Sequence, residues 1–207
     1  MVMDAPEGID PAEAIREAAE ERARDERFRQ RAAIAIGVLA MLLAITGLGG
    51  ANATKEMLNA NIQASDTWAF YQAKTIRQTS NQLAAEELEA LLLTQPALAA
   101  DARAQIQQRV DGFRATVARY ESEPSTGEGK QELLARAQGF EQRRDRAGQQ
   151  DPNFDYAQAL YQIGIVLGSV SIVGTSRRLL GLALGLGVVA TLLMFNGFLL
   201  LLPLPVG

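Results

Sequence analysis

The chain contains no cysteine and no histidine among its 207 residues. Without cysteine there is no disulfide, no thiolate nucleophile and no Cys-based zinc or iron–sulfur site. Without histidine there is no His-ligated haem and no catalytic triad with an imidazole base. These two absences exclude most familiar active sites. We therefore expect a protein that is not an enzyme, with no catalytic residue, no metal site and no cofactor.

Charged residues are missing from three long stretches, Ala32–Ala53, Tyr156–Ser176 and Leu179–Leu202. A helix needs roughly 20 apolar residues to cross the hydrocarbon core, and a charge at its centre costs about 2.5 to 3.5 kcal/mol. Each stretch is therefore predicted to be a transmembrane helix. The predicted fold class is an all-α membrane protein, with three spans and an extracytoplasmic hairpin of long helices or a coiled-coil-like bundle.

Basic residues predict the orientation of the spans, because short segments rich in Lys and Arg stay on the cytoplasmic side. Five arginines lie between Arg22 and Arg31, before the first span, and Arg177-Arg178 separates the second span from the third. The predicted order is a cytoplasmic polar helix (1–31), a span (32–53), an extracytoplasmic helical domain (54–155), a span (156–176), a cytoplasmic turn (177–178), a span (179–202) and an extracytoplasmic tail (203–207).

The segment after the first span reads as helix almost throughout, since Ala, Gln, Glu, Leu and Arg dominate it. One set of residues recurs at alternating steps of four and three, which is the spacing of a coiled-coil seam. This set consists of Leu58, Ile62, Ser65, Ala69, Gln72, Ile76, Thr79 and Leu83. Its small and polar members favour a loosely packed bundle or a wide assembly of several helices.

Proline and glycine predict where these helices begin and end. Asp10 before Pro11 is typical of a helix start, and the same Asp-Pro pair at 151–152 predicts that a new helix begins there. The long helix is expected to continue to Gln95, to be interrupted or only kinked by Pro96, and to resume from about Leu98 to Glu121. The loop at 123–130 is predicted to reverse the chain, and a further helix is predicted from Gln131 to about Ala147.

The run from Asn61 to Arg77, which contains Trp68, Tyr71, Gln72, Ala73 and Lys74, resembles a bacterial membrane-protein family of unknown function, domain-of-unknown-function family 4337. The position of this run after a first span, and the two spans at the C-terminal end, fit the same resemblance. The resemblance implies a bacterial inner membrane. It implies no activity, ligand or catalytic residue.

Tyr71 and Gln72 lie three and four residues after Trp68, so the three side chains are expected to share one helix face. Large rigid side chains dominate interface energies, so these three residues, with Ile76 and Leu83 further along the seam, are candidates for contacts between subunits or within the chain. A ligand-recognition patch is the alternative. Lys74 is expected near this face with its charge in solvent. Within the spans, small-xxx-small pairs predict close helix packing at Gly164, Gly168, Gly181 and Gly185.

Two classes of function remain. The first is a structural scaffold or accessory subunit, either a homo-oligomer or part of a larger membrane protein complex. The second is an extracytoplasmic ligand-binding sensor that signals through a partner. A passive oligomeric pore, lined by Ser169, Ser171, Thr175 or Asn196, is a weaker alternative. Membrane lipid is the expected surrounding partner, and no region is basic enough to predict nucleic-acid binding.

Overall fold

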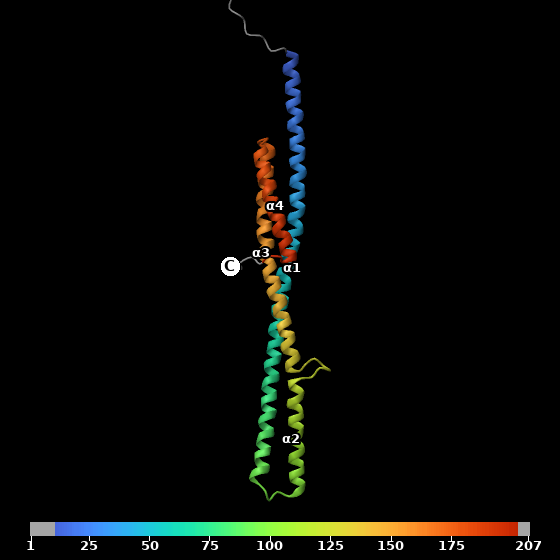
Figure 1. Ribbon diagram of the computed structural model, residues 1–207, viewed down its shortest axis with the longest axis vertical. Helices are drawn as coiled ribbons and strands as arrows, with labels where there is room; N and C mark the ends of the chain where they lie inside the picture. Colours follow the sequence, from blue (N-terminus) through green and yellow to red (C-terminus); the bar gives the residue numbers. More distant parts are fainter. Residues whose placement is uncertain (1–10, 203–207) are drawn as a thin grey trace, which may run out of the picture. The chain divides into compact units, whose positions relative to one another are not determined.

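The computed structural model describes residues 11–202, which form four α-helices and no strand (Figure 1). The helices are α1 (Pro11–Thr94), α2 (Ala100–Glu121), α3 (Lys130–Val173) and α4 (Arg177–Leu199). The predicted all-α class is confirmed. Helices α1, α3 and α4 are each long and apolar enough to cross a membrane. The predicted cap at Asp10 and the predicted tail at 203–207 lie outside the described residues.

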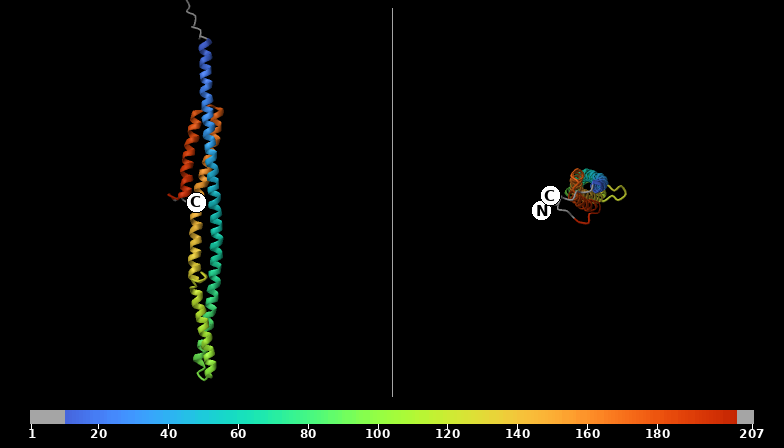
Figure 2. Two further views of the ribbon diagram at one scale, coloured as in Figure 1. Left: turned by 90° about the vertical axis from the view of Figure 1, so that its right-hand side faces the viewer. Right: turned by 90° about the horizontal axis from the view of Figure 1, so that it is seen from above.

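Contacts divide the chain into two compact units. The first, here called the apolar-helix unit, combines residues up to 53 with residues from 149 onward, and the second, the hairpin unit, comprises residues 54–148. The apolar-helix unit holds the charge-free part of α1, more than half of α3 and all of α4. Figure 2, a view turned by 90°, shows these three helices lying against one another.

The core of the apolar-helix unit forms where all three helices meet. Leu39 of α1, Ala157 and Tyr161 of α3, and Ala190 and Met194 of α4 make up its buried cluster. The Tyr161 hydroxyl lies 2.8 Å from Thr191 Oγ1, so the ring is buried without an unpaired hydroxyl. An unbonded hydroxyl in such surroundings would cost about 1–3 kcal/mol.

Phe154 fills a space that glycines create on two neighbouring helices. A Cβ atom built on Gly49 would lie 2.6 Å from Phe154 Cε1, and one built on Gly197 would lie 2.9 Å from the same atom. The ring of Phe198 packs edge-on against Phe154, with centroids 4.9 Å apart. Phe154 is only 1% exposed, so the glycines are there because no side chain fits beside the ring.

Helix α3 continues through Pro152, so the prediction that Asp151-Pro152 starts a new helix is wrong. Proline has no N–H to donate to the carbonyl of Gly148, and a proline inside a helix costs about 3 kcal/mol. Packing next to Pro152 offsets this cost. Asn153 is fully buried, donates from Nδ2 to the Gln149 carbonyl at 2.9 Å and accepts from Asn196 Nδ2 at 2.7 Å.

In the hairpin unit, α2 and then α3 run back along α1. Contacts with successively earlier residues of α1 establish this direction: the pairs are Arg114 with Glu89, Glu121 with Gln78, Glu141 with Trp68, and Arg143 with Glu56. Figure 1 shows α2 beside the C-terminal part of α1. The chain therefore reverses at residues 95–99 around Pro96, and the prediction that the loop at 123–130 reverses it is wrong.

Residues 122–129 leave the helical path and return to it, because Glu132 holds both ends of the loop. Its carboxylate accepts from Ser122 Oγ at 2.7 Å and from the backbone N–H of Glu123 at 3.2 Å. Within the loop, Gly127 has a φ of +67°, which favours glycine. Gly129 has no room for a side chain against Ser122 and Glu123. The loop is thus a bulge between two helices that point the same way.

The glycine contacts around Phe154 generate a stability prediction. Gly49→Ala places a methyl group against the ring, and because Phe154 is enclosed on several sides the change should cost about 1–3 kcal/mol. Gly37→Ala is the matched control, since nothing lies within 4 Å of a Cβ at that position of the same helix. The measurement is thermal unfolding of the purified full chain in detergent. Equal midpoints for the two variants would contradict this account of the core.

Candidate functional site

Helix α1 carries two heptad faces within the hairpin unit. The inward face packs on α2 and α3, and its members are buried or half-buried: Met57, Ala60, Ala64, Thr67, Tyr71, Lys74, Gln78, Asn81 and Ala85. Alanine dominates its buried positions, and small side chains let two helix backbones approach closely. Val110 of α2 and the buried residues Leu133, Ala137 and Ala147 of α3 complete this core.

The outward face consists of the seam that the sequence predicts, from Leu58 to Leu83. All eight of its residues are exposed. The four large apolar members, Leu58, Ile62, Ile76 and Leu83, are between 54% and 67% exposed. Since each residue advances about 100° around a helix, the two faces lie roughly 150° apart. Helix α1 therefore uses one heptad within the chain and presents a second heptad to its surroundings.

The predicted interface residues divide between the two faces. Trp68 is half-buried at the border, and its Nε1–H donates to Glu141 Oε1 at 2.9 Å. Tyr71 packs edge-on against Trp68, with centroids 5.6 Å apart, and lies 5.5 Å from Lys130 Nζ. Gln72, Ile76 and Leu83 belong to the outward face. The five candidates that the sequence analysis groups together therefore lie on different faces of α1.

Lys74 lies on the inward face and is 4% exposed, so the expectation of a solvent-facing charge is wrong. Its Nζ lies 3.7 Å from Glu123 Oε2 and 3.9 Å from Glu128 Oε2, both in the loop between α2 and α3. The same nitrogen lies 5.6 Å and 5.4 Å from the ring centroids of Phe70 and Tyr120. The buried ammonium is thus neutralised by two carboxylates and stabilised by two aromatic faces.

A second polar group lies one turn further along the same face. Gln78 Nε2 donates to Glu121 Oε2 at 2.9 Å, and Lys130 Nζ donates to Gln78 Oε1 at 2.9 Å. The hydrogen bond from Gln78 is the main cause that lowers the pKa of Glu121, and the charge of Lys130 acts in the same direction. For Glu132, the hydrogen bond from Ser122 is the main cause of a lowered pKa.

The glycines predicted to pack the spans also divide. A Cβ on Gly164 would lie 3.2 Å from the Ala183 carbonyl oxygen, and one on Gly168 would lie 2.8 Å from Ile36 Cγ1. Nothing lies within 4 Å of a Cβ on Gly181 or Gly185. On α4 the close contacts are made instead at Gly187, against Leu39, and at Gly197, against Phe154.

Sequence reasoning missed the inward heptad and the pairing of Lys74. The inward heptad has a detectable signal, because Ala60, Ala64 and Ala85 share its spacing, but a search for large apolar residues selects the opposite face. The pairing of Lys74 with Glu123 has no local signal, since the two residues meet only after the chain reverses. Among the described residues, no group of three or more carboxylates is placed to hold a metal ion.

The described helices define the class of protein: an all-helical chain in which three helices are apolar and long enough to cross a membrane. Residues 28–200 match the family described as Domain of unknown function (DUF4337), and the chain belongs to that family. No curated protein and no solved structure matches the chain.

The Lys74 cluster generates a stability prediction. Lys74→Met removes a buried cation that holds the loop at 122–129 against α1. We expect a loss of about 1–3 kcal/mol, less than for a fully buried ion pair, because Glu123 and Glu128 keep some contact with water. Lys55→Met, at an exposed position of the same helix, is the control. Hydrogen exchange of the loop should accelerate only in the Lys74 variant, and unchanged exchange there would contradict the prediction.

The lowered pKa values of Glu121 and Glu132 predict a dependence on acid pH. A carboxylate whose pKa is lower in the folded state stabilises that state above its unfolded pKa, here about 4.5, and the stabilisation is lost as pH falls through the lower folded value. The thermal midpoint of the chain should therefore fall as pH decreases below about 4.5. In the double variant Glu121→Gln, Glu132→Gln this fall should be smaller, and an identical pH profile would refute the assignment.

Proposed function

We propose that the protein is a non-enzymatic, membrane-anchored scaffold whose copies associate in parallel through the outward heptad of α1. The observation that carries this proposal is the exposure of all eight residues from Leu58 to Leu83 on a helix whose other heptad is already occupied. A heptad of this spacing fits the matching heptad of another helix. Apolar side chains that recur at this spacing over several turns gain by leaving water together.

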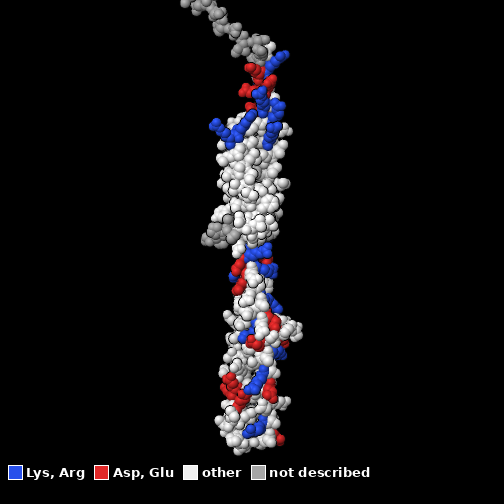
Figure 3. Space-filling model, viewed as in Figure 1, with Lys and Arg blue, Asp and Glu red and all other residues white. Residues whose placement is uncertain are grey.

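The proposed setting is a bacterial inner membrane, with the N-terminus in the cytoplasm and the hairpin unit outside. The lengths and composition of α1, α3 and α4 support three spans. The cluster Arg22–Arg31 and the turn at Arg177 are both predicted to be cytoplasmic, and arginines of both line one cavity at one end of the apolar-helix unit. On the face shown in Figure 3, a zone without charged side chains adjoins that basic end.

A second copy of the same chain is the partner that this setting favours. The outward heptad begins at Leu58, five residues after the last residue of the predicted span at Ala53, and α1 is continuous between them. Copies anchored in one bilayer share the same chain direction where the predicted span ends, so we propose that their heptads pair parallel and in register. In that register Ile62 meets Ile62, and Gln72 meets Gln72, so the amides can hydrogen-bond across the seam and fix the alignment.

The strength of the seam fits an association that depends on the anchor. Burying the exposed part of Leu58, Ile62, Ile76 and Leu83 contributes about 1 kcal/mol per side chain, so roughly 8 kcal/mol for two copies. Free association in solution costs an estimated 4–15 kcal/mol, which would cancel at least about half of this gain and could exceed it. Anchoring in one membrane reduces that cost because it confines position and orientation beforehand.

Two observations favour the scaffold over the other candidate functions. Trp68 and Tyr71, which a sensor would use for its ligand, make contacts within the chain to Glu141 and Lys130. The polar groups that a pore would line up are also bonded internally: Ser169 to the Ile165 carbonyl, Ser171 to the Gly168 carbonyl, and Asn196 to Asn153.

Cysteine cross-linking tests the proposed assembly, because the natural chain has no cysteine to interfere. Ile62→Cys and Ile76→Cys place single thiols on the outward heptad. In native membranes with a mild oxidant, each should give a disulfide-linked dimer, since facing residues at such positions come within disulfide distance. The measurement is the dimer fraction on a non-reducing gel.

Gln63→Cys and Arg77→Cys are the matched controls, since they are exposed neighbours that point away from the seam. They should cross-link several-fold less. Equal cross-linking of seam and control positions would mean random collision and would refute the parallel seam. Cross-links to a different protein in place of dimers would make the chain an accessory subunit of a larger complex and would also refute self-association.

A further inference from the structure

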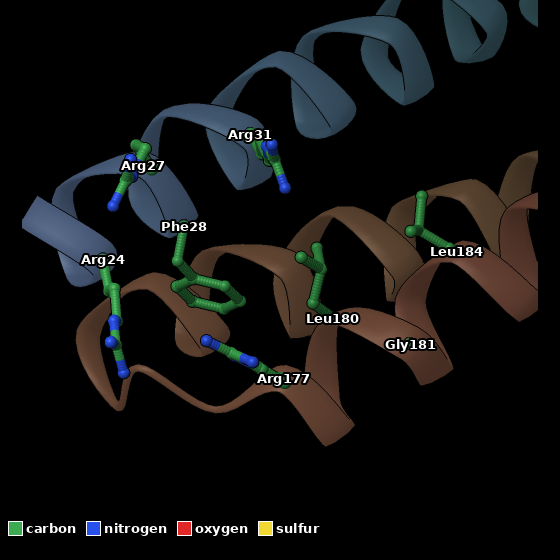
Figure 4. A pocket seen from close by; sticks show the side chains of 8 residues that line it. All are labelled: Arg24, Arg27, Phe28, Arg31, Arg177, Leu180, Gly181 and Leu184. Carbon is green, nitrogen blue, oxygen red and sulfur yellow. The ribbon is translucent and has the colours of Figure 1, made fainter.

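A cavity of about 570 Å³ lies at one end of the apolar-helix unit, between the N-terminal part of α1 and the start of α4. Four arginines line it, Arg24, Arg27 and Arg31 from α1 and Arg177 from α4 (Figure 4). Among the residues that the structure describes, no Asp or Glu belongs to its lining. Arginines that converge on one space repel one another, so their arrangement is stabilised by an anion placed between them.

The charges in this cavity are only partly engaged by the chain. Arg24 Nη2 lies 3.3 Å from Glu20 Oε2, an exposed pair of the kind that contributes little. Arg27 Nε donates to the Ala23 carbonyl at 3.1 Å, which leaves its two terminal nitrogens for other partners. Guanidinium groups suit phosphate because their N–H groups can donate to two of its oxygens at once.

The first turn of α4 adds to the attraction for an anion. Its N-cap, Ser176, makes no side-chain hydrogen bond to the helix, and the turn contains no acidic residue. The start of a helix carries a partial positive charge from its free N–H groups. Arg177 lies in this turn, so the helix and the side chain attract negative charge in the same place.

The rest of the lining is apolar and leads along α4 away from the arginines. Phe28 points from α1 toward α4, and Leu180 and Leu184 lie one turn apart on α4 (Figure 4). Gly181 between them leaves open space, since nothing lies within 4 Å of a Cβ at that position. Arg31 directly precedes the predicted first span and Arg177 lies two residues before the third. The cavity is therefore polar at the level of lipid headgroups and apolar at the level of acyl chains.

We infer that this cavity binds an anionic phospholipid, with its phosphate among Arg24, Arg27, Arg31 and Arg177 and an acyl chain along Leu180, Gly181 and Leu184. Basic cavities between membrane helices on the cytoplasmic side recognise anionic headgroups in this way. The apolar part distinguishes a lipid from free phosphate, which has no use for it. The inference rests on the proposed membrane setting but not on self-association.

The experiment uses the full chain, purified in an uncharged detergent and stripped of lipid, with native mass spectrometry to count bound lipid per chain. Phosphatidylglycerol should bind at least tenfold more tightly than zwitterionic phosphatidylcholine. In Arg27→Gln, Arg177→Gln the affinity for phosphatidylglycerol should fall roughly 25-fold, since each arginine contributes about fivefold. Gly181→Leu, which keeps every charge and fills the apolar part, should also weaken binding.

Arg22→Gln, Arg29→Gln is the control, because it removes the same number of positive charges, both from α1, at positions that do not line the cavity. Binding within about threefold of the natural chain is expected. An equal loss in control and cavity variants, or equal affinity for the two lipids, would overturn the inference. Displacement of phosphatidylglycerol by millimolar inorganic phosphate, with no effect of Gly181→Leu, would assign the cavity to free phosphate and overturn it as well.

The outcome is distinguishable from failure of the proposed function. Lipid is counted per chain, so binding is scored whether the chains are single or associated. Extraction of the chain from membranes by salt or alkali, without detergent, would instead refute the membrane setting on which both proposals depend.

Discussion

Close approach between helices is the constraint on which the rest of the structure depends. In the hairpin unit it is met by alanines at Ala60, Ala64 and Ala85, and in the apolar-helix unit by glycines such as Gly49 and Gly197. Because alanine occupies the most buried positions of the inward face, the large apolar residues Leu58, Ile62, Ile76 and Leu83 lie elsewhere on α1. They lie on the outward face, and for this reason a helix already packed within its own unit still carries an exposed heptad.

The basic side chains also divide into two groups. Some are paired within the chain, and others line a cavity with no carboxylate partner among its described residues. In the hairpin unit, Glu123 neutralises Lys74 and Glu121 neutralises Lys130, which also donates a hydrogen bond to Gln78. In the apolar-helix unit, Arg27 and Arg177 line a cavity whose walls, within residues 11–202, contain no carboxylate. Internal pairing contributes to stability, whereas converging unpaired cations favour an external anion. The proposed self-association uses the exposed apolar face of α1, and the proposed lipid binding uses the basic cavity.

Much of the helical content was predictable because it depends on local properties. Three local properties of the sequence carried these predictions. They are the absence of charge over the length of a span, the abundance of good helix formers, and the loop residues near 123–130. The predicted helix boundaries and chain reversal were wrong where contacts between residues far apart in the chain determine the structure. Pro152 is a strong local signal for a helix start, but buried Asn153 and Phe154 keep α3 continuous. The chain reverses at Pro96 because α2 and α3 pack on the inward face of α1. The residues of the turn do not show which face of α1 this is.

The sequence by itself determined that the chain is helical, that three of its helices suit a membrane, and that a heptad runs from Leu58 to Leu83, because each follows from composition and spacing along one helix. Only the tertiary structure decided which of two heptads on α1 faces inward, that Lys74 is buried, and that Arg177 joins Arg24, Arg27 and Arg31 around one cavity. These facts require residues far apart in the chain to meet. Spacing along one helix carries no information about which other helix packs against it.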